Sequence, residues 1–135
     1  MPCSWYREVR TQLEGSGLFT EVEIVGAKVR GWITKELYLD VYYDPTSRSY
    51  SYALIDQGLR YPGDRRLFGW DDYPHESVEE IKRLKSYPHH FQRREGARWI
   101  FEESPMRGDV CKEIGLVLEK IGTYLRASRE LREQS

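Results

Sequence analysis

The chain has 135 residues, of which 39% are hydrophobic and 32% are charged, as expected of one folded globular domain rather than a disordered chain. Its formal net charge of −1 excludes an overall basic field for binding nucleic acid, so any such surface must be local. The sequence has no stretch approaching the roughly 18 apolar residues of a membrane span and no secretory signal pattern. We therefore expect a cytoplasmic protein with no membrane partner. The absence of asparagine, together with many Arg and Glu residues, is the composition bias of a thermophile.

The first half of the chain predicts one helix followed by strands. Apolar residues recur at helical spacing over Trp5–Glu14. The stretch Leu18–Val29 is rich in β-branched residues, and Gly26 within it indicates a bulge or bend. Apolar and polar side chains alternate over Trp32–Tyr43, which predicts one continuous strand. A proline-containing turn follows, so we expect an antiparallel partner strand over Tyr50–Ile55.

The next segments predict two further strands with a short helix between them. Arg65–Trp70 has the composition of a strand. Ser77 is followed three residues later by Glu80, and this spacing is a capping box that predicts a helix over Val78–Lys85. The last strand is expected over Ala97–Glu102.

A long apolar stripe that begins at Val110 predicts a final helix, which is opened by Ser104-Pro105 or by Gly108-Asp109. Its charged tail, residues 126–135, is expected to fray or project. The order of the elements is helix, strands, helix. We therefore predict a single α+β domain over residues 1–135, with an antiparallel, hairpin-rich sheet of four to six strands packed against N-terminal and C-terminal helices.

All three histidines lie in two short segments, and each segment places a histidine directly after a proline. Histidine gives and accepts protons near neutral pH, so two of them brought together can cleave a phosphodiester by general acid–base catalysis. We predict His75 and His89 as the acid–base pair, with His90 in reserve and Asp71 orienting a histidine. Each histidine taken alone is equally typical of a residue that braces a loop.

Basic and aromatic side chains surround the two segments. The planar fork of Arg matches two phosphate oxygens, and exposed aromatic rings stack on unpaired bases. The Arg pair after the second segment is also typical of a solvated loop. The candidate substrate-binding residues are Arg65, Arg66, Trp70, Tyr73, Tyr87, Arg93 and Arg94.

The same segments also carry ligands of the kind that bind divalent metal ions. If a metal site exists, its predicted ligands are Asp71, Asp72, His75 and His89. No spacing of the HxxxH type fixes two ligands on one helix, so the leading expectation includes no metal and no cofactor. Neighbours on an extended segment point in opposite directions, so at most one of His89 and His90 faces a given site.

The two proline–histidine segments resemble the TumE-type toxin family. The resemblance covers about residues 30–125 and rests on Tyr50-Ser51-Tyr52, on Leu67 to His75 and on Tyr87-Pro88-His89-His90. It implies a toxin of a toxin–antitoxin pair, partnered by a helix-turn-helix antitoxin. Asp72 stands where the family usually has asparagine, and Gln92 stands where the family has a further histidine.

The resemblance and the histidine chemistry together predict a toxin that acts on RNA as a metal-independent, histidine-based endoribonuclease. The alternative is a non-enzymatic module that binds protein or RNA, because a tyrosine-rich sheet face suits an interface. A long amphipathic helix or an unpaired sheet edge is suited to forming a homodimer.

Overall fold

The computed structural model describes residues 4–61 and 63–134. Within these residues, seven strands form one antiparallel sheet in which each strand pairs with the next along the chain. The strands are β1 Glu21–Val25, β2 Lys28–Trp32, β3 Leu37–Tyr43, β4 Tyr50–Asp56, β5 Arg66–Asp71, β6 His90–Glu95 and β7 Arg98–Glu102. The helices are α1 Trp5–Gly15, α2 Glu79–Lys82 and α3 Val110–Gln134.

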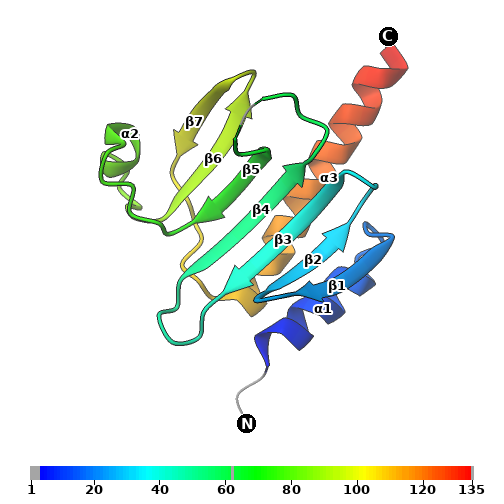
Figure 1. Cartoon of the computed structure of the whole chain (residues 1–135), viewed down its shortest axis with the longest axis horizontal. Helices are drawn as coiled ribbons and strands as arrows, with labels where there is room; N and C mark the ends of the chain where they lie inside the picture. The colour runs from blue at the N-terminus through cyan, green and yellow to red at the C-terminus, as the bar shows by residue number, and fades with distance from the viewer. Residues whose placement is uncertain (1–3, 62, 135) are drawn as a thin grey trace.

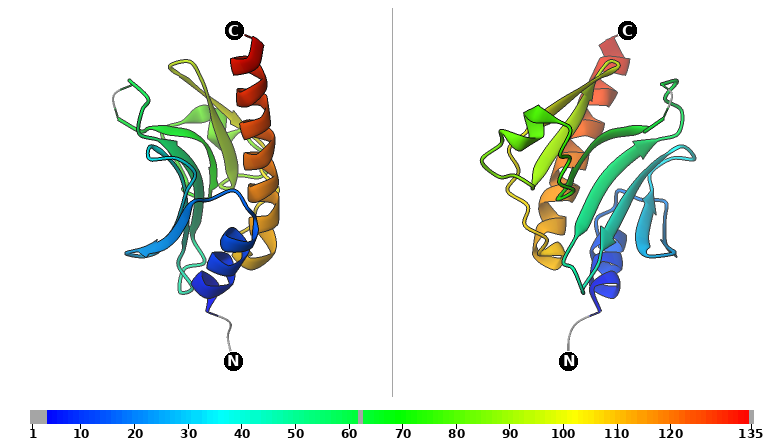
Figure 2. Two further views of the ribbon diagram at one scale, coloured as in Figure 1. Left: turned by 90° about the vertical axis from the view of Figure 1, so that its right-hand side faces the viewer. Right: turned by 60° about the vertical axis from the view of Figure 1, so that its left-hand side comes forward.

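Helices α1 and α3 cover one face of the sheet (Figure 2). Figure 1 is viewed from the opposite face, with both helices behind the strands and α2 beside the β6–β7 end. The core between helices and sheet uses every second residue of the central strands, as alternation requires. Its buried members include Val9, Leu13, Leu39, Val41, Tyr50, Tyr52, Phe68, Trp70, Phe91, Ile114, Val117 and Ile121.

The predicted α+β class with an antiparallel, hairpin-rich sheet is confirmed, with seven strands rather than four to six. One extra strand arises because a turn at residues 26–27 divides the predicted Leu18–Val29 stretch and a second turn, at residues 33–36, interrupts the predicted Trp32–Tyr43 strand. In that turn the Thr34 hydroxyl accepts the backbone N–H groups of Glu36 and Leu37 at 3.2 and 3.0 Å. Gly26, predicted as a bulge or bend, lies in the β1–β2 hairpin turn with a φ of 59°.

The segment between β5 and β7 differs most from the prediction. The capping box is wrong, because Val78 rather than Ser77 occupies the N-cap and α2 has only 4 residues. Residues 90–95, part of which was expected to be a solvated loop, form β6. Its arginines are compatible with a strand because Arg93 pairs with Glu102 across the β6–β7 hairpin.

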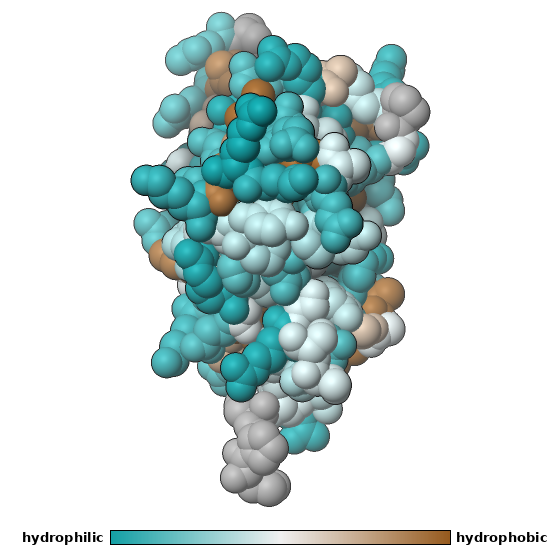
Figure 3. All heavy atoms as spheres, turned by 90° about the vertical axis from the view of Figure 1, so that its left-hand side faces the viewer, coloured by the Kyte–Doolittle hydropathy of each residue, from teal (hydrophilic) through white to brown (hydrophobic). Residues whose placement is uncertain are grey.

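The final helix begins at Val110, directly after Gly108-Asp109, the second of its two predicted openings, and continues to Gln134, so residues 126–134 are helical. Ser135 lies outside the described residues. No helix in the described part of the chain is both long and apolar enough to cross a membrane. Seen from the side that carries α2 in Figure 1, the surface is mainly hydrophilic, with only scattered hydrophobic residues (Figure 3).

Candidate functional site

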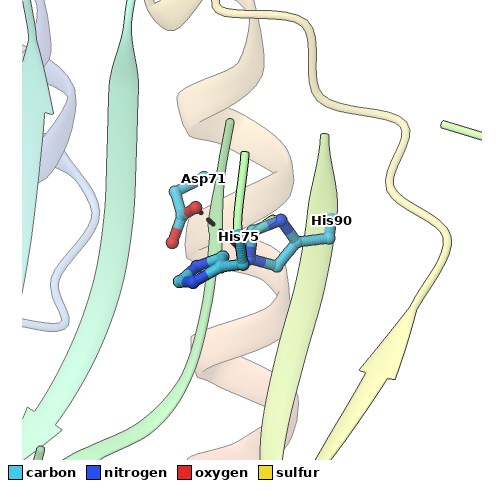
Figure 4. A group of neighbouring side chains, drawn as sticks. All are labelled: Asp71, His75 and His90. Carbon is cyan, nitrogen blue, oxygen red and sulfur yellow. Dashed lines mark ion pairs between the residues drawn. The ribbon is translucent and has the colours of Figure 1, made fainter. Parts of the chain in front are cut away.

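Asp71 and His90 lie side by side on the face of the sheet that the helices leave uncovered. The two residues are register partners at the paired ends of β5 and β6. Their neighbours Trp70 and Phe91 point into the core beneath the helices, so alternation directs Asp71 and His90 to the other face. His75 comes from the loop after β5 and folds back over the pair (Figure 4).

These three side chains form a compact cluster. Each offers one carboxylate oxygen or imidazole nitrogen, and the three atoms all lie within 4.8 Å of one another. The His75 and His90 rings meet edge to face with centroids 5.2 Å apart. We call Asp71, His75 and His90 the Asp-His-His cluster.

Hydrogen bonds fix the Asp71 carboxylate on both sides. Its Oδ2 accepts a bond from Arg66 Nη1 at 2.9 Å, and its Oδ1 accepts the backbone N–H of Tyr73 at 2.9 Å. Its Oδ1 also lies 3.3 Å from His90 Nε2. Because Arg66 is largely buried and paired with it, Asp71 keeps one orientation in the absence of any ligand.

His90 is fully buried, and its environment determines its tautomer. Its Nδ1 lies 3.0 Å from the carbonyl oxygen of Pro88, which can only accept, so Nδ1 carries a hydrogen. Its Nε2 is directed at Asp71 Oδ1 and at the side-chain oxygen of Gln92, each 3.3 Å away. Nδ1 of His90 is therefore held by the Pro88 carbonyl, and Nε2 faces the oxygens of Asp71 and Gln92.

A pocket of about 350 Å³ opens above the cluster. His75 lines it, and burial lowers the pKa of the His75 imidazole while the nearby Asp71 carboxylate acts in the opposite direction. The other charged residues of the pocket wall are Asp64, Arg66, Asp71 and Asp72. The pocket thus has three carboxylates and one guanidinium, and its wall is acidic.

His89, predicted as the partner of His75, has different neighbours. Its Nδ1 lies 2.8 Å from the Tyr50 hydroxyl, and the two rings stack with an interplanar angle of 13°. Burial, and then the charge of Arg107, lower its pKa. Since Tyr50 belongs to the core under the helices, the structure brings His75 together with His90 and not with His89.

Of the aromatic residues predicted to stack on bases, some lie near the pocket and others do not. Tyr73 is 64% exposed, and its ring lies 4.7 Å from that of His75. Tyr87 is exposed but does not line the pocket. Trp70 is only 6% exposed and packs on Phe91 in the core, which corrects the expectation that it stacks on a base.

Of the four predicted phosphate-binding arginines, Arg66 alone lines the pocket. Arg65 is exposed and donates to the Gln57 carbonyl. Arg93 is paired with Glu102, and Arg94 lies over the Trp99 ring at 4.3 Å.

Two further polar residues belong to the pocket wall. Asp72, a predicted metal ligand, lies outside the Asp-His-His cluster and accepts hydrogen bonds from the Ser49 hydroxyl and the Tyr50 backbone N–H. Gln92 was noted in the sequence only as a departure from the family pattern. The signal for its role was its spacing of two from His90, which places both on one face of a strand.

The comparisons with known proteins add no assignment: no family model, curated protein or solved structure matches the chain. The resemblance to TumE-type toxins therefore stays a prediction. Function has to be argued from the Asp-His-His cluster and its pocket.

Proposed function

We propose that the protein is the toxin of a toxin–antitoxin pair and cleaves RNA at the Asp-His-His cluster. The observation that supports this is the convergence of two histidines and an aspartate, from segments separated in sequence, on one pocket of the open sheet face. Imidazole and carboxylate groups in a pocket are the usual constituents of sites for phosphodiester cleavage.

The members of the cluster have different access to a substrate. His75 is partly exposed and lines the pocket, and its ring nitrogens make no hydrogen bond within the described residues. It is therefore the histidine positioned to contact a bound phosphodiester. His90 is buried and held through Nδ1, and Asp71 is held by Arg66, so these two support and orient the reacting group. Tyr73 is exposed beside His75 and offers a ring on which a base can stack.

A second surface favours binding of a protein partner. A pocket of about 360 Å³ lies beside the edge strand β1, lined mainly by the aromatic and apolar side chains of Trp5, Tyr6, Ile24, Tyr42 and Tyr43. Aromatic residues are enriched in protein interfaces, and an unpaired strand edge accepts an extended peptide. This surface suits an antitoxin segment, and it also suits the non-enzymatic alternative.

Cleavage of RNA by the purified chain tests the proposal. We expect His75→Ala to reduce the cleavage rate by roughly 100-fold or more, the usual contribution of one acid–base group, and to abolish growth inhibition. The exposed neighbour Glu76 provides a control, because Glu76→Gln changes a charge next to His75 outside the cluster. RNA that stays intact with the wild-type protein, or equal cleavage by His75→Ala, would rule out the proposal in favour of a binding module.

A further inference from the structure

We propose that Asp71, His75 and His90 bind one divalent transition-metal ion at the base of the pocket. The binding itself is independent of the proposed function. Its use in cleaving RNA rests on that function, and an ion held by His75 would itself supply the contact to the phosphodiester that His75 makes in a metal-free site. The inference replaces the expected metal-free site and also the ligand set expected from the sequence, since His90 takes the place of His89 and Asp72 is outside the cluster.

The spacing of the ligand atoms suits such an ion. Donor atoms about 2.0 Å from a tetrahedral zinc ion lie about 3.3 Å from one another. The Oδ1 of Asp71 and the Nε2 of His90 are 3.3 Å apart, so two of the three atoms already have this separation. His75 completes a set within 4.8 Å and lies on a loop rather than in the sheet, so a small movement of that loop closes the remaining distance.

The hydrogen bonding of His90 is that of a metal ligand. A ligating histidine commonly donates its second ring N–H to a backbone carbonyl or carboxylate, which fixes the tautomer and ring orientation. Nδ1 of His90 makes such a bond to the Pro88 carbonyl, and this leaves the Nε2 lone pair facing the Asp71 carboxylate. Two electron-rich atoms at this distance in a buried position need a proton or a cation between them.

The charges of the pocket point to a cation as well. Asp64, Asp71 and Asp72 line the pocket with Arg66, which is itself paired with Asp71. A phosphate entering this pocket would meet net negative charge. A divalent ion reverses that balance and provides a direct partner for a phosphate oxygen.

Two imidazole nitrogens and one carboxylate oxygen favour zinc or a similar first-row ion over magnesium or calcium, which prefer oxygen ligands. Three protein ligands are also the number found in catalytic zinc sites, where a fourth position stays open for water or substrate. Gln92 lies beside that open side, because its Oε1 is 3.3 Å from His90 Nε2 and the residue lines the pocket.

Calorimetric titration of the EDTA-treated, dialysed full chain with zinc chloride tests this site. We expect one ion per chain for the wild type. Removal of a ligand should weaken affinity by at least about 100-fold, more than the loss of an outer hydrogen bond, in His75→Ala and in Asp71→Asn. Because Asp71 also holds Arg66, circular dichroism must show that its variant is folded. His75→Ala changes only a loop residue and keeps the test valid if Asp71→Asn does not fold.

A matched control comes from the adjacent histidine. His89→Gln removes one imidazole from the same segment but leaves the Asp-His-His cluster unchanged, so its zinc affinity should equal that of the wild type. Gln92→His tests the converse, because it places a further nitrogen ligand beside His90 and should tighten binding by about tenfold or more. Absence of saturable binding, or weak binding that is the same in all these variants, overturns the metal site.

RNA cleavage with and without EDTA separates this inference from the proposed function. Loss of cleavage on chelation, restored by zinc, supports both. Cleavage that is insensitive to EDTA in a protein that does not bind zinc overturns the metal site and leaves the nuclease proposal standing. Zinc binding that depends on His75, in a protein that never cleaves RNA, establishes the site and overturns the nuclease proposal.

Discussion

His89 and His90 are adjacent in the sequence, yet their side chains lie on opposite faces of the sheet. The ring of His89 stacks on Tyr50 in the core under the helices, while His90 faces Asp71 on the open side. The backbone at the start of β6 is extended, so consecutive side chains diverge. Substitution of one histidine should therefore leave the surroundings of the other largely unchanged, which is why His89→Gln serves as the control for substitutions in the Asp-His-His cluster.

The carboxylate of Glu103 binds the backbone of the segment just before His89 and His90. Its Oε2 and Oε1 accept the backbone N–H groups of Lys85 and Ser86 at 2.9 and 2.8 Å. The hydrogen bond from Lys85 is the main cause of a lowered pKa for Glu103. A folded-state pKa below the unfolded one gives stability that is present above the ordinary Glu pKa of about 4.3 and is lost as the pH falls through the folded value.

We therefore predict that Glu103→Gln lowers the free energy of unfolding at pH 7, and that the difference from the wild type shrinks as the pH falls below about 4. Urea unfolding of both proteins at several pH values measures it. A difference that is equally large at pH 7 and at pH 3 would show that the carboxylate charge of Glu103 has no part in fastening the segment.

The location of the site could be predicted from the sequence, but not the partners within it. Asp71 and His75 lie in one short motif, and the second histidine segment is close enough along the chain to reach them. The choice between His89 and His90 depends on which faces the open side. That is fixed only by the pairing of β6 with β5, through Asp71 with His90 and Trp70 with Phe91. Because β6 was not predicted from the sequence, its pairing with β5 could not be predicted either.

Gly69 in β5 lies directly against the backbone of the neighbouring strand β4. A Cβ added there would lie 2.6 Å from the Tyr52 carbonyl oxygen and 3.1 Å from the Ala53 Cα. Both are backbone atoms of the neighbouring strand, so they cannot rotate away as the end of a flexible side chain can. Gly69 is thus required for the close approach of β4 and β5 beneath the pocket.

We predict that Gly69→Ala lowers the free energy of unfolding by about 1–3 kcal/mol, the usual cost of overpacking. Gly115→Ala is the control, because Gly115 lies in α3 with nothing within 4 Å of an added Cβ. There the same substitution should raise the stability by up to about 1 kcal/mol, since alanine favours a helix. Denaturant unfolding of both variants measures whether each substitution lowers or raises the free energy of unfolding. Destabilisation of equal size at both positions would contradict this explanation.

Elements with strong local patterns were predictable, and those fixed by distant contacts were not. The helix over the apolar stripe from Val110 follows from periodicity, and the strand at Tyr50 follows from the proline-containing turn before it. The capping-box pattern failed at Ser77 because residues 76–77 form a turn, in which the Val78 backbone N–H donates to the His75 carbonyl, and the helix begins only after Val78. The turn after Trp32 was missed because apolar and polar residues alternate on both sides of it, as in a continuous strand. The turn is stabilised by the Thr34 hydroxyl, which accepts backbone hydrogen bonds from the residues that follow it.

For the whole molecule, the main feature is a sheet with the two long helices, α1 and α3, on the same face (Figure 2). The uncovered face has to satisfy its own polar groups, and pairs such as Arg30 with Asp40 and Arg66 with Asp71 do so. The α+β class and the packing of the two outer helices followed from the order of the elements. Which face would carry the site did not, because that depends on the register of all the central strands together.

The tail of α3 extends past the sheet (Figure 1), and this bears on whether the chain forms a homodimer. Residues 129–134 are all exposed, and Leu131 is 69% exposed. Surface residues of this kind contribute within about 0.5 kcal/mol each to stability. We therefore predict that deletion of residues 129–135 changes the free energy of unfolding by no more than about 3 kcal/mol, the sum of such contributions, and leaves the number of subunits, obtained from the molar mass by light scattering, unchanged.

The opposite result would have a specific meaning. If a second copy of the chain covers the tail, deletion will lower both the molar mass and the stability, because subunit association stabilises the folded state by mass action. Leu131→Ser would then produce the same change alone, since Leu131 is the large hydrophobic side chain that the tail exposes. An unchanged number of subunits in both variants would assign any self-association to another surface, such as the free edge of β1 beside the aromatic pocket.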